Sequence, residues 1–410
     1  MAMRWCSTVS EQDGLEAAAR EACATLRRDL GGARADLVIA FVSEHHRTGY
    51  RDLAPILEAE LGSGLLLGCT ARSVIGGGRE IEESPALSLT AAALPGVELT
   101  PFHLDVEQLP EPDAPLEAWG RACGVGDGNG DAHFLLLADP FSFDVERLIR
   151  GLDAAFPAGK KLGGVASGGR TPGDNALYLR ERVHRAGLVG VALSGEIELD
   201  TIVAQGCRPI GLPMFVTRCR DNVLQELDGR PALEVLQELY ESLSPPDQEL
   251  CGGSLFLGIE MKEAQGEYQQ GDFLIRNLLG SDADSGTLTV GAVLRGLQVV
   301  QFHLRDARTS AEDLERRLSH YGSERDTAAA RGAVLFSCLG RGAHLYGRPN
   351  HDSEVLRRHL GDVALGGFFC NGEIGPVQGT TFLHGYTSAF GIFRERTAVT
   401  RRRTPARSRA

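Results

Sequence analysis

The sequence lacks the patterns that mark a secreted or membrane protein. Its 410 residues contain no window of eighteen uncharged apolar residues, and the opening MAMRWCSTVSEQDG has no apolar run between a basic leader and a small-residue cleavage site. We therefore expect a cytoplasmic protein without membrane insertion. With 42% apolar and 24% charged residues, the composition is that of an ordinary globular protein, and the length predicts two or three domains.

Paired cysteine spacing is also missing. No C-x-x-C occurs, and the cysteines are scattered singly along the chain, so the sequence predicts neither a disulfide framework nor a zinc site. We expect most of them to be reduced and buried, and we expect no metal or other cofactor. The nine are Cys6, Cys23, Cys69, Cys123, Cys207, Cys219, Cys251, Cys338 and Cys370.

Positive charge is scarce outside the C-terminus. The formal charge is −13, but residues 394–410 hold seven arginines against Glu395 and so carry +6, which leaves −19 for residues 1–393. An acidic body does not favour nucleic-acid binding, because phosphate contacts require a clustered basic face. We expect the basic tail to be disordered and solvated, with weak binding of RNA or an acidic partner as the alternative.

Internal similarity is the strongest pattern that is present. Residues 96–104, GVELTPFHL, resemble residues 296–304, GLQVVQFHL, and residues 162–169, LGGVASGG, resemble residues 365–372, LGGFFCNG. A third, shorter echo lies at residues 67–71, LGCTA. We interpret the pattern as a duplication built from a smaller unit of strand, helix, glycine turn and strands. For each glycine turn alone, tight or close-packed backbone is the simpler explanation.

The order of the elements predicts the fold class. Strands alternate with helices every few tens of residues, which indicates an α/β to α+β fold with two related halves of mixed sheets and flanking helices. Pro231 suits the first turn of a helix that ends near Leu243. The following Ser244-Pro245-Pro246-Asp247 predicts a linker between domains.

Several ordered motifs resemble the FIST family. They are DGRPAL at 228–233, GDFLIRN at 271–277, FSCLGRG at 336–342, GFFCNGEIGP at 367–376 and TFLHGYTS at 381–388. The resemblance implies a FIST N-like domain at 36–220 and a FIST C-like domain at 221–393, after an extension at 1–35 and before the tail at 394–410. It also implies an intracellular sensory or signal-transduction protein that binds a small ligand such as an amino acid.

The resemblance leaves the output of the signal open. Some eukaryotic relatives carry an F-box and act as adaptors, but no F-box, kinase or receiver segment is visible in this sequence. Residues 1–35 are too few for an added output domain, so we expect signalling through a separately encoded partner protein. Two alternatives remain: an interaction adaptor without a small ligand, and an enzyme of unrecognised type.

The predicted ligand site lies in the C-terminal half, with a site at the interface between the two halves as the alternative. Arg341 stands between Gly340 and Gly342, which let main-chain N–H groups point into one concavity beside its planar guanidinium, so the motif resembles a carboxylate or phosphate receptor. Asn371 supplies a donor and an acceptor, and Glu373 could hold the ammonium group of an amino acid. Alternatively, Glu373 pairs with Arg341 or caps a strand end without any ligand. The full predicted set is Ser337, Gly340, Arg341, Gly342, Cys370, Asn371, Gly372, Glu373 and His384.

Catalysis by these residues is the weakest hypothesis. Cys370 and His384 are fourteen residues apart, and Phe368 and Phe369 place Cys370 in an apolar setting. Burial raises the pKa of a thiol, whereas a nucleophile needs it lowered. We therefore expect no catalytic residue, with His384 lining the pocket or bonding to the backbone.

Overall fold

The computed structural model describes residues 2–62, 64–126, 130–262 and 267–396. They form two compact units. The first consists of the described residues up to 203, from 317 to 383 and from 388 on, and the second of those from 204 to 316 and from 384 to 387. The expectation for the tail falls outside the described residues beyond position 396.

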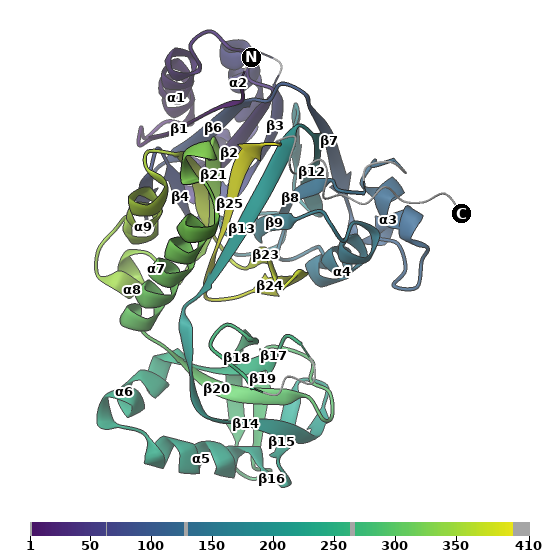
Figure 1. The fold of residues 1–410 in the computed structure, drawn as a ribbon, viewed down its shortest axis with the longest axis vertical. Coiled ribbons are helices and arrows are strands. Elements are labelled where there is room, and N and C mark those ends of the chain that lie inside the picture. The colour runs from purple at the N-terminus through teal and green to yellow at the C-terminus, as the bar shows by residue number, and fades with distance from the viewer. Residues whose placement is uncertain (1, 63, 127–129, 263–266, 397–410) are drawn as a thin grey trace. The chain divides into compact units, whose positions relative to one another are not determined.

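The first unit is built from three repeats that follow one plan: an edge strand, a helix, a central strand, a helix, a third strand, a hairpin and a last strand (Figure 1). The first repeat holds β1 (Arg4–Ser10), α1 (Leu15–Leu30), β2 (Leu37–Ser43), α2 (Leu53–Leu61), β3 (Leu65–Ala71), β4 (Ser73–Gly76), β5 (Arg79–Ile81) and β6 (Leu87–Ala93). The first two of these elements fall in the stretch that the sequence assigned to an N-terminal extension.

The other two repeats match this order. The second holds β7 (Val97–Leu104), α3 (Leu116–Ala122), β8 (His133–Ala138), α4 (Val145–Ala155), β9 (Lys161–Val165), β10 (Leu177–Leu179), β11 (Arg182–His184) and β12 (Leu188–Gly195). The third holds β13 (Ile197–Gln205), α7 (Ala307–Glu324), β21 (Gly332–Cys338), α8 (Ala343–Tyr346), α9 (His351–Leu360), β22 (Ala364–Cys370), β23 (Glu373–Val377), β24 (Thr380–His384) and β25 (Thr387–Glu395).

Each repeat completes its sheet with a hairpin from another repeat. The three sheet orders are β1-β6-β2-β3-β10-β11, β7-β12-β8-β9-β23-β24 and β13-β25-β21-β22-β4-β5. The hairpin of the second repeat thus extends the first sheet, that of the third extends the second, and that of the first extends the third. The third echo, at residues 67–71, therefore belongs to a complete repeat of its own. The three repeats exchange hairpins in a cycle.

The repeated glycines at residues 68, 163–164 and 366–367 lie inside strands and not in turns, and pairing with the central strand makes Gly367, not Gly366, the counterpart of Gly163. Gly68, Gly163 and Gly367 lie on the third strand of their repeats, each beside the central strand. A Cβ atom at these positions would stand 2.2, 1.9 and 1.9 Å from the carbonyl oxygens of Ala40, Leu136 and Leu335. The parallel strands therefore approach at a distance that only glycine permits.

The core between the sheets draws on all three repeats. The strands β2, β8 and β21 are buried along nearly their whole length. Phe41 stacks on Phe368 at 4.6 Å between ring centroids, and both contact the ring of Phe336. Leu135 and other side chains of the second repeat join the same cluster. The repeats thus share one apolar core.

The second unit is a closed β-barrel. Its strands are β14 (Cys207–Arg220), β15 (Val223–Leu227), β16 (Arg230–Pro231), β17 (Leu255–Glu260), β18 (Phe273–Asp282), β19 (Thr287–Val290) and β20 (Val299–Arg305), with α5 (Ala232–Ser242) and α6 (Pro245–Ser254) between β16 and β17. The sheet runs β14-β20-β17-β18-β19-β15-β16, and antiparallel pairing of β14 with β15 closes a ring of six strands. The predicted boundary at 220/221 falls within this unit, between β14 and β15.

Two details of the sequence interpretation are corrected. The match of residues 96–104 with 296–304 joins β7 to β20, which belong to different units, whereas the counterparts of β7 are β1 and β13. The predicted linker at Ser244 is the start of α6, because the Ser244 hydroxyl accepts a hydrogen bond from the main chain of Asp247 and Pro245 occupies the first turn.

The close approach of the strands predicts opposite effects for two glycine-to-alanine changes in the first unit. Gly163→Ala should lower the free energy of unfolding by about 1–3 kcal/mol, because the new methyl group overlaps a backbone carbonyl. Gly322→Ala, in an exposed turn of α7 with nothing nearer than 3.8 Å, should raise it by up to about 1 kcal/mol. Urea unfolding curves test both, and a Gly163→Ala protein as stable as wild type would contradict the close approach.

Candidate functional site

Arg341 is completely buried and forms a bidentate ion pair with Asp352. Its Nε lies 2.9 Å from Oδ2 of Asp352 and its Nη2 lies 3.1 Å from Oδ1. Arg341 follows β21, and Asp352 lies in the first turn of α9. The guanidinium fork that the sequence offers to a ligand carboxylate is thus directed at a carboxylate of the chain itself.

Further donors surround Asp352. Ser388 Oγ donates to Oδ2 at 2.5 Å, and His351 Nδ1 lies 2.9 Å from Oδ1. Arg341 Nη2 also donates to the hydroxyl of Tyr346, whose ring stacks on His351 at 3.6 Å. Burial alone raises the pKa of Asp352, but the Arg341 charge and these hydrogen bonds bring it well below its ordinary value. The carboxylate is therefore held ionised.

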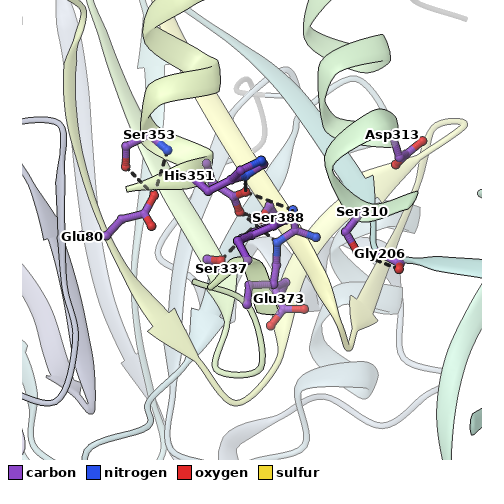
Figure 2. Close-up of polar contacts among 12 residues, drawn as sticks. Glu80, Gly206, Ser310, Asp313, Ser337, His351, Ser353, Glu373 and Ser388 are labelled. Atoms are coloured by element: carbon purple, nitrogen blue, oxygen red, sulfur yellow. Dashed lines mark hydrogen bonds and ion pairs between the residues drawn. The ribbon is translucent and has the colours of Figure 1, made fainter. Parts of the chain in front are cut away.

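Glu80 comes to this cluster from the exchanged hairpin of the first repeat. Its Oε1 accepts hydrogen bonds from the main-chain N–H and the hydroxyl of Ser353, both at 2.8 Å (Figure 2). The N–H of Ser353 lies at the N-terminus of α9, where a negative charge is favourable. Burial, and then the charge of Asp352, raise the pKa of Glu80 to about 7.

The same hairpin also contacts α8. Glu82 Oε1 accepts a hydrogen bond from the main chain of Ala343 at 2.9 Å. Gly342 precedes it with a φ of 65°, and a Cβ there would lie 2.6 Å from Glu82. Gly342 thus makes room for a carboxylate from the first repeat. We call Glu80, Arg341, Tyr346, His351, Asp352, Ser353 and Ser388 the seam cluster, since they join the third repeat to the first.

Two atoms of the seam cluster are buried without a hydrogen-bond partner among the described residues: Nη1 of Arg341 and Oε2 of Glu80. Arg341 is 0% and Glu80 4% exposed. Buried polar atoms are nearly always paired, because leaving one unpaired costs about 1–3 kcal/mol. One donor and one carboxyl oxygen are therefore available inside an otherwise satisfied network.

The other predicted residues lie at strand ends nearby. Cys370 Sγ lies 3.4 Å from both the carbonyl oxygen of Ser337 and Oε1 of Glu373, which is itself completely buried. Asn371 donates to the carbonyl of Ala166 at 3.0 Å, and the carbonyl of Gly372 accepts from Val165. Burial, and then the carboxylate of Glu373, raise the pKa of the Cys370 thiol well above its usual range.

The structure brings together only part of the predicted set. Figure 2 shows Ser337, Ser388 and Glu373 gathered in one region of the first unit. His384 belongs to the second unit. Sequence reasoning missed Asp352, Ser388 and Glu80. The first two follow or lie within the motifs around Arg341 and TFLHGYTS, but Glu80 carries no local signal because it is 273 residues from its partner Ser353.

Breaking the buried ion pair should be costly. We expect Asp352→Asn to lower the free energy of unfolding by about 3–5 kcal/mol, because it leaves the Arg341 charge buried without a counter-charge. Glu354→Gln, which removes the partner of Arg348 in an exposed ion pair at the N-terminal end of the same helix, should cost at most about 1 kcal/mol. Chemical unfolding measures both, and an equal loss of unfolding free energy in the two variants would show that the buried ion pair stabilises the fold no more than the exposed one.

The raised pKa of Glu80 predicts a pH dependence. Between pH 4.5, the ordinary pKa, and about pH 7, Glu80 of the folded chain keeps a proton that the unfolded chain releases. The contribution of Glu80 to the free energy of unfolding is therefore largest below this window and falls as the pH rises through it. The slope reaches at most about 1.4 kcal/mol per pH unit. Glu80→Gln should remove this component, so the stability difference between variant and wild type should change between pH 5 and 7. A constant difference would show that Glu80 is ionised in the folded protein.

Comparison with known proteins finds two family domains and close relatives along most of the chain. Residues 36–230 match the FIST N domain and residues 232–376 the FIST C domain. An uncharacterized protein of Mycobacterium tuberculosis (strain H37Rv) is 37% identical over 388 residues, which is 94% of this chain and 98% of that protein. An uncharacterized protein of Mycobacterium bovis is 35% identical over 379 residues, covering 92% and 95%.

More distant similarities also occur. An F-box/LRR-repeat protein of Arabidopsis thaliana is 24% identical over 251 residues, which is 53% of this chain and 45% of that protein. Two cyanuric acid hydrolase structures, one from A. caulinodans, align at 9% and 10% identity, each with a TM-score of 0.36 and covering 96% of this chain and all of theirs. These structures are too distant to transfer an activity.

The two domain matches cover most of the chain, and the mycobacterial relatives align along nearly their whole length. FIST domains are associated with sensory roles in signal transduction. No helix among the described residues combines the length and apolar character needed to cross a membrane. The chain belongs to the FIST family.

Proposed function

We propose that this chain is a non-catalytic cytoplasmic sensory protein that binds a small ligand, an amino acid or another small carboxylate, and signals through a separate partner protein. The sensory role of FIST domains supports the first part of this proposal. The proposed ligand rests on one observation: two buried atoms of the seam cluster, Arg341 Nη1 and Glu80 Oε2, have no hydrogen-bond partner among the described residues. All nine cysteines are free thiols, which is consistent with a reducing compartment.

The two atoms have the chemistry that an amino acid requires. A guanidinium N–H donates to a carboxylate, and a carboxyl group of pKa about 7 can ionise to accept from an ammonium group. Asp352 fixes Arg341, and Ser353 fixes Glu80. In our proposal the bound ligand bridges the third repeat and the exchanged hairpin of the first, so ligand binding and hairpin closure stabilise each other.

The arrangement of the reactive groups supports a non-catalytic role. Ser388 donates to Asp352, and His351 lies against the other oxygen of the same carboxylate. Activation of a serine nucleophile requires a base strong enough to take its proton. The carboxylate beside Ser388 is a weak base, because the Arg341 charge, against the effect of burial, holds the pKa of Asp352 well below its ordinary value. The raised pKa of Cys370 keeps its thiol protonated.

Exposed apolar side chains support output through a partner protein. Leu212, Phe215, Val293 and Leu297 of the second unit are 79%, 53%, 74% and 77% exposed. Leu297 also has a φ of 66°, an unfavourable conformation for a leucine. Contiguous exposed apolar surface marks interaction sites, and Leu297 lies beside Phe215, since its N–H donates to the carbonyl of the next residue, Val216. The same observation favours the second candidate function, an adaptor without a small ligand.

A thermal-shift screen against amino acids and small carboxylates tests the ligand. At a hundred times Kd, a ligand that binds only the folded chain stabilises it by about 2.7 kcal/mol. We expect at least one amino acid to raise the Tm of wild type, and Glu80→Gln to lose this shift because the ammonium group loses its charged partner. Glu354→Gln is the matched control on the surface and should keep the shift.

Arg341→Lys tests the proposed contact of Arg341 with the ligand carboxylate. Lysine keeps the positive charge, whereas Arg341→Ala would leave Asp352 buried and unpaired. Lysine cannot reproduce the planar fork, so the shift should shrink in this variant as well. A response that survives in both Glu80→Gln and Arg341→Lys would move the ligand away from the seam cluster. No shift with any compound would favour the adaptor.

A further inference from the structure

The second unit contains a buried arginine without a counter-charge. Arg305, at the end of β20, is 8% exposed, and its Nε and Nη1 are buried without a hydrogen-bond partner. Among the described residues, no carboxylate lies within ion-pair distance of it. Arginine stays protonated in proteins, and a buried charge is costly unless it is paired. Arg305 therefore differs from Arg341, whose charge Asp352 neutralises.

Aromatic rings hold the guanidinium instead. The Cζ atom of Arg305 lies 4.7 Å from the ring centroid of Tyr386 and 5.9 Å from that of Phe256. These two rings are 4.2 Å apart. The hydroxyl of Tyr386 is hydrogen-bonded to the side-chain oxygen of Asn277. Cation–π contacts orient the charge but leave the N–H groups, which lie in the guanidinium plane, without acceptors.

Neighbouring charges do not supply those acceptors. Asp306, the next residue along the chain, pairs with Arg208 at 2.9 Å, and Asp247 pairs with the same arginine. His303 lies two residues before Arg305 on β20, and burial lowers its pKa to about 4, so it is neutral at pH 7. The side chains around Arg305 thus carry one positive charge that no acid in the described part of the chain balances.

Two motifs that are far apart in the sequence meet here. Asn277 ends GDFLIRN on β18, and Tyr386 lies in TFLHGYTS, beyond β24. Asn277 is exposed and Tyr386 is half-buried, so the solvent reaches the contact between them, and the Tyr386 ring lies against the Arg305 guanidinium. Tyr386 has a φ of 66°, a conformation that costs energy in any residue except glycine. Strained backbone of this kind clusters at active sites, ligand sites and switch regions.

We propose that Arg305 is the anion-binding centre of a second site, in the barrel, and that its ligand is a small organic monocarboxylate. One guanidinium charge matches a monoanion, whereas a phosphate dianion would need further cations. The carboxylate is planar and accepts hydrogen bonds in the plane of the guanidinium. Phe256 and Tyr386 offer aromatic faces to a flat apolar body attached to it.

This site is independent of the proposed function at the seam cluster. Its residues all belong to the second unit, and those of the seam cluster all belong to the first. A monocarboxylate without an ammonium group has no need of Glu80. The barrel site can therefore be tested with a probe that the seam cluster does not require, and either proposal can fail while the other holds.

Benzoate is a suitable probe, with neutral benzamide of the same shape as its control. Binding is followed by calorimetry and by the ¹⁵N resonance of the Arg305 Nε–H group, assigned by its loss in Arg305→Lys. We expect benzoate to raise Tm and to shift that resonance, and benzamide to do neither. Arg305→Lys should weaken benzoate binding roughly tenfold or more, because the charge-assisted hydrogen bonds in the plane are lost.

Matched variants separate binding from folding. Arg218→Lys changes an exposed arginine of the same unit and should leave the benzoate affinity unchanged. Tyr386→Phe keeps the ring and removes the bond to Asn277, so it provides a second weakened variant should Arg305→Lys fail to give the wild-type circular dichroism spectrum. Benzoate affinity that is equal in wild type and in both weakened variants would overturn the proposal, as would the absence of benzoate binding to wild type.

Discussion

The exchange of hairpins between repeats is the constraint on which the first unit depends. Each sheet has four strands of its own repeat and takes its last two from another, so no repeat has a complete sheet by itself. The shared aromatic contacts of Phe41, Phe336 and Phe368 show the same dependence in the core. The three repeats therefore gain most of their buried area together, and folding of the unit should be cooperative.

Exchange also explains where the polar chemistry lies. The hairpin β4–β5 of the first repeat brings Glu80 and Glu82 against the starts of α9 and α8 in the third. The hairpin of the second repeat forms the same backbone pairing, but Val183 occupies the register where Glu80 stands in the first. The backbone plan is thus repeated three times, while the buried charges around Arg341 belong to one junction.

Some of this could be predicted from the sequence. The glycine echoes indicated repetition because Gly68, Gly163 and Gly367 each lie where a third strand comes too close to the central strand for a side chain. The motif around Arg341 led to a predicted receptor for a ligand anion, whereas the Arg341 fork is paired with Asp352. The number of repeats was less visible, because the match of residues 96–104 with 296–304 joins strands of different units. The partners of Arg341 and Glu80 were not predictable, since Ser353 meets Glu80 only through an exchange of strands between distant repeats.

The two buried arginines show why local sequence is a poor guide to a binding site. Arg341 lies in a glycine-rich motif that resembles an anion receptor, yet its fork is filled by Asp352, eleven residues further on. Arg305 follows the unremarkable strand VVQFHL and lies next to an acid, yet Asp306 pairs with Arg208 and leaves Arg305 to Phe256 and Tyr386. A buried charge can bind a ligand only when every nearby counter-charge is paired with another residue. Which residues pair is decided by the tertiary structure and not by their order in the sequence.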